Sequence, residues 1–462
     1  MKKIGIFFLL LLCLLQVLPL RSMASGEDLG CSTLQARRAL AEAEPYTGTA
    51  KAVILYEQNT QTLVYAHNPD LPINPTGLIK LLTALIVLEE GNLEDVVTVK
   101  RSTLNSVGVG SVSAGLQAGE EITLRDLLYC VMVSSANDAA AVMAEHVAGS
   151  QAEFVKKMNE RAATLGCVNT HFTNVHGLKD DRQLSTAREL AIITAEALKN
   201  PAFCELFAVT EYIVPATNLS AARNLSTTNY MMDPDSKYYD SRVTGGKPAA
   251  ASTSDRSIIC TAQSEDARYL CVVISAKART SGSSVTRFTN FDEAGKMLTF
   301  GLEGFAVQQV LGMEQPFGMY PVEGGENDLV IGPDSQVFAM LPTKFDPTKL
   351  TFEDVRDAAA LRAPVAEGTA VGTLRIYYDA LLIAQVHLMA RHSVAPVGTT
   401  IQKPDPVGSG AGGVLGMFLK WTGIILAAVL LFAAAVVLVL RRINLSRRKN
   451  SRRRVPGTRE RR

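Results

Sequence analysis

The sequence predicts an α/β (α+β) domain over residues 46–304, a small β-rich domain over residues 305–392 and one transmembrane helix over residues 421–440. Three observations lead to this prediction. Expected strands lie at both ends of the first segment with helices between them, short alternating runs fill the second, and the third is apolar and free of charge. With 462 residues, 47% of them apolar, the chain is long enough for two folded domains.

Residues 1–24 have the features of a secretory signal peptide. Lys2 and Lys3 precede an apolar run over residues 4–20, and Ser22-Met23-Ala24 is a small-x-small cleavage site. We therefore expect cleavage after Ala24 and export of the residues that follow. An uncleaved N-terminal anchor is the alternative.

The first domain is expected to begin with two strands, residues 50–58 and 62–67. A helix that is apolar almost all round, residues 78–90, is expected to be buried and to end at Gly91. Further helices are expected at residues 124–133, 138–147, 151–165 and 186–199. Helices placed between strands in this way favour an α/β or α+β domain.

Residues 256–261 and 269–276 alternate as the strands of a β-hairpin do. If the hairpin turns around residues 264–267, Cys260 lies opposite Cys271. Because disulfides persist in exported proteins, we predict a cross-strand disulfide between these two residues. The alternative is two reduced thiols that pack side by side as small apolar groups.

The β-rich domain is predicted from short alternating runs separated by Gly, Pro and Asp. These runs are residues 328–331, 336–340, 372–378 and 381–389. Residues 393–420 are expected to form a linker, because their first part is rich in Pro, Gly and Ser.

Residues 421–440 carry no charge, and at about 1.5 Å per residue a helix of this length spans the ~30 Å hydrocarbon core of a bilayer. The tail that follows, residues 441–462, carries eleven Lys and Arg against one Glu. The positive-inside rule therefore predicts a single-pass protein of the cell membrane, with an extracytoplasmic body and a cytoplasmic tail. Lipid or partner binding by the tail would be an additional role.

Charge and ligand spacing argue against several function classes. Residues 25–440 contain 32 basic and 44 acidic residues, and this acidic body argues against a nucleic-acid partner, which requires a basic face. Neither the cysteines nor the six histidines stand at the spacing of metal ligands. We therefore expect no metal and no cofactor.

Three separate segments carry residues that indicate chemistry. Lys80 lies in the first turn of the buried helix, where a lysine is costly unless it has a partner or a task. Ser135 and Asn137 stand at the break between two predicted helices, and residues 243–245, Val-Thr-Gly, precede the hairpin. Each segment alone has a structural explanation, such as a helix cap.

Together, the order and spacing of these segments resemble the S-x-x-K, S-x-N and K-T-G motifs of penicillin-binding proteins and serine β-lactamases. The chain is most similar to the serine-type D-alanyl-D-alanine carboxypeptidases, the low-molecular-mass penicillin-binding proteins. The similarity extends to VMVSSANDAAAVMAEHVAG, NERAATLGCVNTHFTNVHGL and, in the β-rich part, APVAEGTAVGTLRIYY. It implies a transpeptidase-like fold for the first domain.

The resemblance also implies roles for individual residues. Members of that family remove the terminal D-alanine of peptidoglycan stem peptides through an acyl-enzyme on the first-motif serine. In that mechanism Lys80 would be the general base, while Ser135 and Asn137 would relay protons and hold the substrate. Backbone N–H groups of Gly77 and Gly246 would form the oxyanion hole, and Thr244-Gly245 would complete the substrate-binding strand.

Two positions depart from the family pattern. Aligned on Lys80, the nucleophile position is Gly77, which has no atom to acylate, and aligned on Thr244-Gly245, the third-motif lysine is Val243. The residues directly before these two positions, Thr76 and Arg242, are poor substitutes for the missing serine and lysine. The hydroxyl of Thr76 would be rotated by ~100° on a helix, and the side chain of Arg242 would face the other side of a strand.

Two other residues remain open as substitutes. Lys247 could reach back toward the substrate, and Ser135 could attack with Lys80 as its base, although it would not sit over the usual oxyanion donors. The leading hypothesis is nevertheless a pseudoenzyme that binds cell-wall stem peptides or a cell-wall protein. The alternatives are an active carboxypeptidase with a relocated nucleophile and a non-catalytic interaction scaffold.

Overall fold

The computed structural model describes residues 39–41, 45–108, 111–281, 284–314 and 316–398. Contacts divide the chain once, between Val397 and Gly398. The predicted signal peptide, the transmembrane helix, the basic tail and most of the linker lie outside the described residues. Within the described part of the chain, we find no helix with the length and apolar character needed to cross a bilayer.

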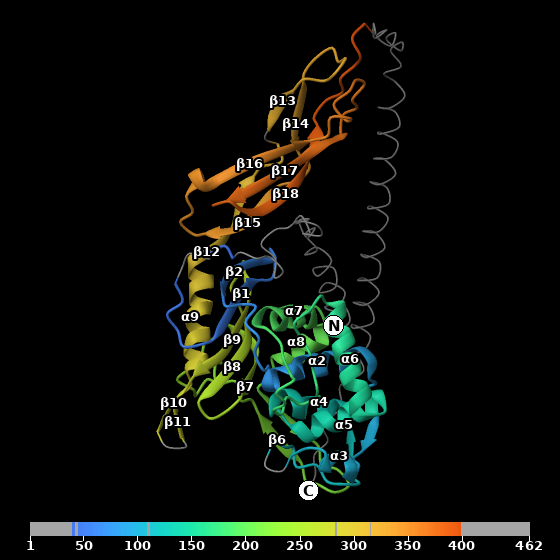
Figure 1. The fold of residues 1–462 in the computed structure, drawn as a ribbon, viewed down its shortest axis with the longest axis vertical. Coiled ribbons are helices and arrows are strands. Elements are labelled where there is room, and N and C mark those ends of the chain that lie inside the picture. Colours follow the sequence, from blue (N-terminus) through green and yellow to red (C-terminus); the bar gives the residue numbers. More distant parts are fainter. Residues whose placement is uncertain (1–38, 42–44, 109–110, 282–283, 315, 399–462) are drawn as a thin grey trace, which may run out of the picture. The chain divides into compact units, whose positions relative to one another are not determined.

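A five-stranded antiparallel sheet lies at the centre of the first part of the chain, with the strand order β2-β1-β9-β8-β7 (Figure 1). Its strands are β1 (Ala52–Glu57), β2 (Thr62–His67), β7 (Val243–Ala250), β8 (Asp255–Gln263) and β9 (Arg268–Lys277). The predicted N-terminal strand pair and the predicted hairpin are therefore confirmed. Segments from both ends of the domain meet because β1 pairs with β9.

Both faces of this sheet are buried, because alternate residues of each strand point to opposite sides. In β1, Ala52 and Ile54 belong to one apolar core, and Val53 and Leu55 belong to another. The helix α9 (Thr289–Gly304) covers the second face, and the remaining helices lie on the first (Figure 1). This layered arrangement confirms the predicted α/β (α+β) class.

The helices on the first face include the five that the sequence predicted. These are α2 (Lys80–Glu90), α4 (Leu124–Val133), α5 (Asn137–Ala148), α6 (Gln151–Thr164) and α7 (Ala187–Ala197) with the shorter α3 (Arg101–Asn105) and α8 (Pro201–Phe207). A 3-10 turn, η1 (Thr76–Ile79), leads directly into α2. The helix α2 is buried over its first eight residues, as its apolar sequence predicted.

Three short antiparallel strand pairs lie outside the central sheet: β3 (Val96–Thr98) with β4 (Glu121–Thr123), β5 (Glu211–Val214) with β6 (Arg223–Ser226), and β10 (Arg279–Ser281) with β11 (Ser284–Arg287). None of them was predicted from the sequence. Their strands have three or four residues each, which is too short for an alternating pattern to be distinctive.

The residues after α9 form strands, as predicted. One antiparallel pair joins β12 (Phe305–Leu311) to β15 (Val337–Pro342), and a five-stranded sheet has the order β13-β14-β18-β17-β16. The strands of that sheet are β13 (Gly318–Tyr320), β14 (Leu329–Pro333), β16 (Leu350–Arg356), β17 (Ala370–Tyr378) and β18 (Leu381–Ala390), with the turn η2 (Pro347–Lys349) before β16. Their apolar residues form a core of their own.

The hairpin register places Cys260 directly opposite Cys271, as predicted, but both thiols are free. The prediction of a disulfide is therefore wrong for this structure. Directly opposed residues in an antiparallel pair hold their Cβ atoms about 4.5–5.5 Å apart, whereas a disulfide prefers about 3.5–4.5 Å. The two cysteines instead pack within the core under α9, as the alternative described.

Candidate active site

A cavity of about 520 Å³ lies where η1, the α4–α5 junction and the free edge of β7 meet. Gly77, Lys80, Ser135 and Asn137 all line it, so the structure brings together four predicted site residues from two segments of the sequence. Its far end is formed by Tyr230 and the first residues of α9. The first and second motifs of the sequence analysis are thus one site.

Lys80 is the first residue of α2 and is only 2% exposed. Its Nζ donates a 2.7 Å hydrogen bond to Asn137 Oδ1 and a second hydrogen bond to the backbone oxygen of His176. Burial and the nearby Lys247 hold the pKa of Lys80 well below its usual range. The amine therefore favours the neutral form, which is the form a general base requires.

The α4–α5 junction presents the second motif to the cavity. The helix α4 ends at Val133, and Ser135 has a left-handed backbone with φ of 64°, an unusual conformation for a non-glycine residue. The chain then enters α5 at Asn137, whose N–H donates to Val112 O at 2.8 Å. This sharp turn directs Asn137 toward Lys80.

Gly77 lies where a nucleophile would be expected. A Cβ atom built on Gly77 would be 3.7 Å from both Lys80 Nζ and Ser135 Oγ, and 3.6 Å from Ala249 Cβ. These are ordinary van der Waals separations, so a hydroxyl one bond further out could reach the lysine. The cavity has space for a serine side chain that the sequence does not supply.

The structure corrects the placement of the third motif. Val243, Thr244, Gly245 and Gly246 all belong to β7, yet none of them lines the cavity. Thr244 Oγ1 lies 2.9 Å from Thr261 Oγ1 on β8, Gly245 packs against Phe207, and Gly246 packs against Cys260. These contacts are internal packing, and they leave the four residues no surface toward a ligand in this cavity.

The segment of β7 that lines the cavity is residues 248–250, and the buried Lys247 directly precedes it. Ala249 Cβ lies against Gly77, and Lys247, two residues earlier, shares that face of the strand. At about 3.3 Å per residue, Val243 is about 13 Å back along the strand from Lys247. Lys247 therefore occupies the position expected of the third-motif cation. It is the residue that the sequence analysis left open as a substitute for the lysine missing at Val243.

Ala250, not Gly246, presents a backbone N–H at the cavity. Ala251 N–H donates to Asp255 O, and alternate residues of an antiparallel strand bond to the same neighbour. The N–H of Ala250 therefore points away from β8 at the free edge of the sheet. Pro248, which has no N–H, occupies an equivalent outward position without loss of a ladder bond.

Lys247 is completely buried, and burial lowers its pKa to about 7. Among the described residues its Nζ has no hydrogen-bond partner. His176, which lines the same cavity, has its pKa lowered to about 4 by burial and by Lys80, so this imidazole is neutral at pH 7.

Buried polar contacts hold the wall opposite β7. Asp138, on α5, accepts hydrogen bonds from Ser113 Oγ and from the N–H groups of Ala114 and Leu116. Residues 111 and 112, at the start of this loop, line the cavity. The loop is therefore fixed to the helix that carries Asn137.

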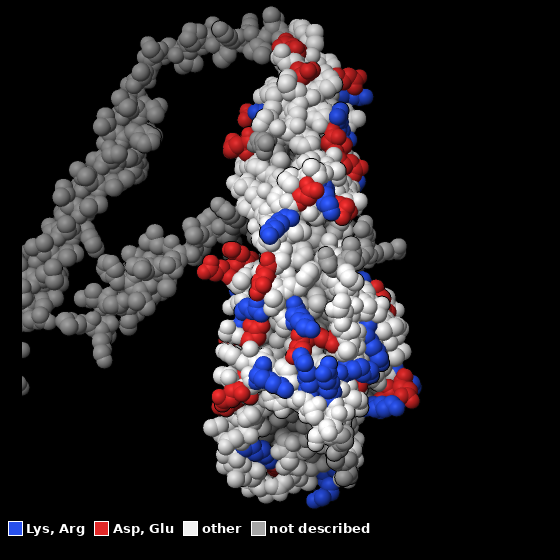
Figure 2. All heavy atoms as spheres, turned by 90° about the vertical axis from the view of Figure 1, so that its left-hand side faces the viewer, with Lys and Arg blue, Asp and Glu red and all other residues white. Residues whose placement is uncertain are grey.

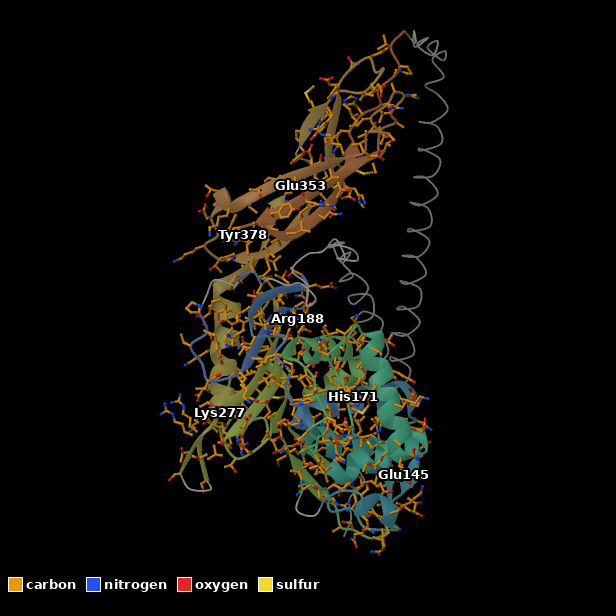
Figure 3. The ribbon with its side chains drawn as sticks, viewed as in Figure 1. Glu145, His171, Arg188, Lys277, Glu353 and Tyr378 are labelled. Atoms are coloured by element: carbon orange, nitrogen blue, oxygen red, sulfur yellow. The ribbon has the colours of Figure 1, made fainter. Side chains whose placement is uncertain are left out.

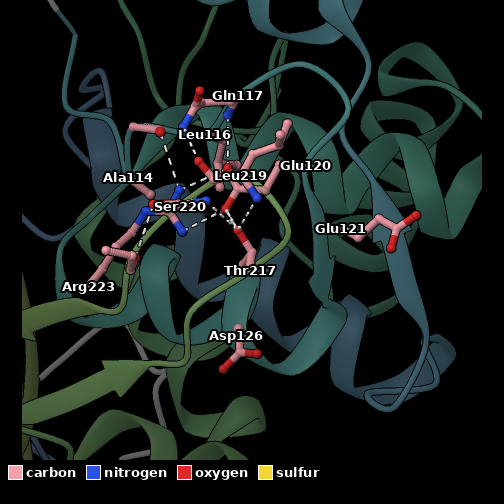
Figure 4. A network of polar contacts seen from close by, with 12 residues as sticks. Ala114, Leu116, Gln117, Glu120, Glu121, Asp126, Thr217, Leu219, Ser220 and Arg223 are labelled. Atoms are coloured by element: carbon pink, nitrogen blue, oxygen red, sulfur yellow. Dashed lines mark hydrogen bonds and ion pairs between the residues drawn. The ribbon is translucent and has the colours of Figure 1, made fainter.

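The same loop is fixed at its other end by a buried ion pair (Figure 4). Glu120 is 0% exposed, and its two carboxylate oxygens lie 2.7 and 2.8 Å from the guanidinium nitrogens of Arg223 on β6. Thr217 Oγ1 and Gln117 N–H donate to the same carboxylate at 2.9 Å each. These bonds lower the pKa of Glu120 and outweigh the effect of burial.

A second ion pair positions the segment that leads into η1. Arg188 of α7, labelled in Figure 3, donates from Nε and Nη2 to the carboxylate of Asp70 at 2.6 and 3.0 Å. Ile73 also forms a β-bridge with Ser185, just before α7. The backbone that ends at Gly77 is therefore anchored to the helical layer.

Within the described ranges, no group of three or more His, Cys, Asp or Glu residues could hold a metal ion. The chemistry available is that of a buried amine, a hydroxyl, an amide and backbone N–H groups around an open cavity. This sheet with its helical layers and this lysine–asparagine cluster define the class of penicillin-binding-protein-like transpeptidase folds.

Comparisons with known proteins agree with this class. The family described as D-alanyl-D-alanine carboxypeptidase matches residues 39–278, and the chain belongs to that family. It is 26% identical over 352 residues to the D-alanyl-D-alanine carboxypeptidase DacF of Bacillus subtilis, covering 76% of this chain and 87% of that protein. DacD of Salmonella typhimurium is 28% identical over 364 residues, covering 77% and 89%.

Solved structures show the same similarity. Penicillin binding protein 5 from Haemophilus influenzae superposes with a TM-score of 0.59 and 25% identity, over 76% of this chain and 99% of that one. The carboxypeptidase DacD from Francisella tularensis superposes with a TM-score of 0.61 at 18% identity, over 78% and 97%, and this match shows the fold alone.

Proposed function

We propose that this chain is a non-catalytic member of its family that binds peptidoglycan stem peptides in the cavity between η1 and β7. The observation that carries the proposal is the absence of a side chain at Gly77, beside Lys80 and Ser135. Loss of the nucleophile in a serine hydrolase costs on the order of 10⁶ in kcat. The amine, the amide and the open cavity that would hold a substrate nevertheless remain.

The relatives named as carboxypeptidases support the choice of ligand, because their names specify a D-alanyl-D-alanine substrate. A penicillin, which acylates a serine in this family, would have no oxygen to react with at Gly77. The proposal therefore separates binding from hydrolysis. A cell-wall protein as the ligand, or a scaffold whose cavity is merely inherited, would give a different result in the experiment that follows.

The test uses the full chain and a stem pentapeptide that ends in D-Ala-D-Ala. We expect a calorimetric binding signal, no release of D-alanine and no covalent adduct with a fluorescent penicillin. The absence of binding would overturn the proposal and leave a cell-wall protein as the ligand or the scaffold. Release of D-alanine, or an adduct located by mass spectrometry, would overturn the non-catalytic assignment.

One alternative retains structural support. Ser135 Oγ lines the cavity and lies 3.7 Å from the position of a Cβ on Gly77, so it is the candidate for a relocated nucleophile. Thr76 is not among the cavity-lining residues, and its N–H is bonded to Asn74 Oδ1. If the wild-type chain forms a penicillin adduct, a Ser135→Ala variant should abolish it.

We also propose that the chain is exported and anchored by residues 421–440, with the tail in the cytoplasm. The supporting features are the small-x-small site at residues 22–24 and the arginine-rich segment after residue 440. Protease added to intact cells should remove the body and leave the tail. A body that resists protease on intact cells but not on lysed cells would contradict this topology.

A further inference from the structure

The cavity contains a cation that no motif of the sequence indicated. Arg256, near the start of β8, is one of the residues that line the cavity. It lies opposite Ala250 in the β7–β8 register, and Ala250 directly follows the residue that packs against Gly77. Arg256 and Gly77 line the same cavity, on either side of the free edge strand β7.

The guanidinium of Arg256 is positioned by an aromatic ring and a backbone oxygen, but within the described part of the chain no carboxylate neutralises its charge. Its Cζ lies 4.7 Å from the ring centroid of Phe288, and its Nε donates to Thr253 O at 3.2 Å. No carboxylate among the described residues lies within ion-pair distance of it. Stacking on an aromatic ring fixes the plane of the guanidinium and leaves its Nη groups as donors.

Other basic residues on the face that carries α9 are different. Figure 2 shows acidic side chains interspersed with the basic ones on this face, and the ion pairs include Lys277 with Asp255 and Arg287 with Asp292. Arg256 differs from these two residues, because it lines the cavity that contains Gly77 and Lys80 and no carboxylate among the described residues pairs with it.

A second unpartnered group lies beside this arginine. Asn290, in the first turn of α9, lines the cavity and is 1% exposed, and its Oδ1 has no hydrogen-bond partner among the described residues. Its Nδ2 donates to Ser257 O at 3.4 Å, which orients the amide. A buried, unpaired carbonyl oxygen is costly unless a ligand supplies an N–H group.

We propose that Arg256 and Asn290 form a subsite for an acylated amino acid, in which Arg256 binds the carboxylate and Asn290 Oδ1 accepts the amide N–H. Tyr230 and Phe288, whose ring centroids are 5.2 Å apart, form the apolar wall beside the side chain of that residue. The subsite rests on the proposed function, because it identifies the group of the stem peptide that the cavity recognises.

The carboxylate has two sources in a stem peptide, the C-terminus and an acidic side chain further along the peptide. The experiment therefore compares a pentapeptide with a free C-terminal carboxylate and the same peptide ending in a carboxamide. Calorimetry of the full chain is repeated with the variants Arg256→Gln, Arg256→Lys and Arg279→Gln. Arg279→Gln is the matched control, because it removes the same charge from an exposed position on β10 outside the cavity.

We expect the free acid to bind the wild-type chain more tightly than the carboxamide by roughly ten- to a hundredfold, which is typical of a charged hydrogen-bonded pair. Arg256→Gln should remove this difference, Arg256→Lys should restore part of it because a single ammonium lacks the bidentate fork, and Arg279→Gln should leave it unchanged.

Each other outcome is decisive. An equal loss of affinity for acid and carboxamide in Arg256→Gln would support the subsite and assign an acidic side chain to it. Tight binding of both peptides to both wild type and Arg256→Gln would overturn the subsite and leave the proposed function standing. If neither peptide binds the wild-type chain, the subsite and the proposed function are both overturned.

Discussion

Gly77 faces Lys80 across an unfilled gap: a Cβ atom on Gly77 would lie 3.7 Å from Lys80 Nζ. Gly77 is not among the residues with positive φ, so its backbone conformation is one that serine also adopts. The amine opposite is already buried and oriented by Asn137. The space for a serine side chain at position 77 and the oriented amine of Lys80 are therefore both present. This relationship leads directly to a gain-of-function experiment.

Gly77→Ser should convert the chain into a protein that penicillin acylates. The new hydroxyl would lie beside the amine of Lys80, whose lowered pKa suits a general base. We expect a covalent adduct on residue 77, detected by mass spectrometry, where the wild type forms none. Gly77→Ala, which fills the same space without a hydroxyl, is the control and should stay inert.

Adding Val243→Lys to Gly77→Ser should not accelerate acylation further. Aligned on the motifs, Val243 stands at the position of the third-motif lysine, but it does not line the cavity, and Lys247 shares the strand face of Ala249, which packs against Gly77. The rate constants of the single and double variants should agree within experimental error. A faster double variant would contradict the register described for β7.

Replacement of Lys247 by methionine should stabilise the fold, and most strongly at neutral or lower pH. The pKa of Lys247 is about 7 in the folded chain, whereas an unfolded lysine has a value of about 10.4. Between these values the unfolded chain binds a proton that the folded chain does not, so wild-type stability rises with pH. Lys247→Met should remove this contribution.

The expected gain is on the order of 4 kcal/mol below pH 7 and should vanish above about pH 10.4. Urea unfolding of both proteins at pH 7, 8.5 and 10 measures the difference. An equal effect at all three pH values would show that Lys247 is protonated in the folded chain. Lys277→Met, at an exposed position on β9, serves as the control.

Glu120→Gln should destabilise the fold by about 3 kcal/mol at pH 7, because it leaves Arg223 without its counter-charge in a buried site. The folded pKa of Glu120 is lowered, so its stabilising contribution is complete above about pH 4.3 and is lost as the pH falls through the folded value. The difference between wild type and variant should therefore shrink in acid.

Urea unfolding at pH 7 and pH 3 tests this pattern. The neighbouring exposed carboxylate in Figure 4 provides the control, and Glu121→Gln should change stability by less than about 0.5 kcal/mol. A pH-independent loss in Glu120→Gln would mean that shape, rather than charge, matters at this position.

The thiols of Cys260 and Cys271 should both react with an alkylating agent as soon as the chain is unfolded without reductant, since both are free. In the folded chain they should react slowly, because both are 0% exposed and the pKa of Cys271 is raised well above its usual range. Peptide mapping that finds Cys260 and Cys271 linked after unfolding would contradict the assignment of two free thiols.

Periodicity in the sequence was enough to predict the long elements. The apolar residues of α2 and the alternation in β8 and β9 are properties of neighbouring residues, so a local pattern contains them. The helix α9 was missed, although it has sixteen residues, and its N-cap residue Phe288 makes no side-chain capping bond. An unmarked start of this kind gives no local signal.

The sequence by itself determined that position 77 carries no nucleophilic side chain, because a glycine has no side chain in any fold, and the first motif is rigidly spaced on one turn of helix. Tertiary structure decided which residues of β7 reach the cavity. That choice depends on the pairing of β7 with β8, including a register shift between Val243 and Gly245, and on the contact between β7 and η1. Arg256 joined the site for the same reason: it belongs to none of the three motifs, and its place at the cavity depends on the pairing of β8 with β7.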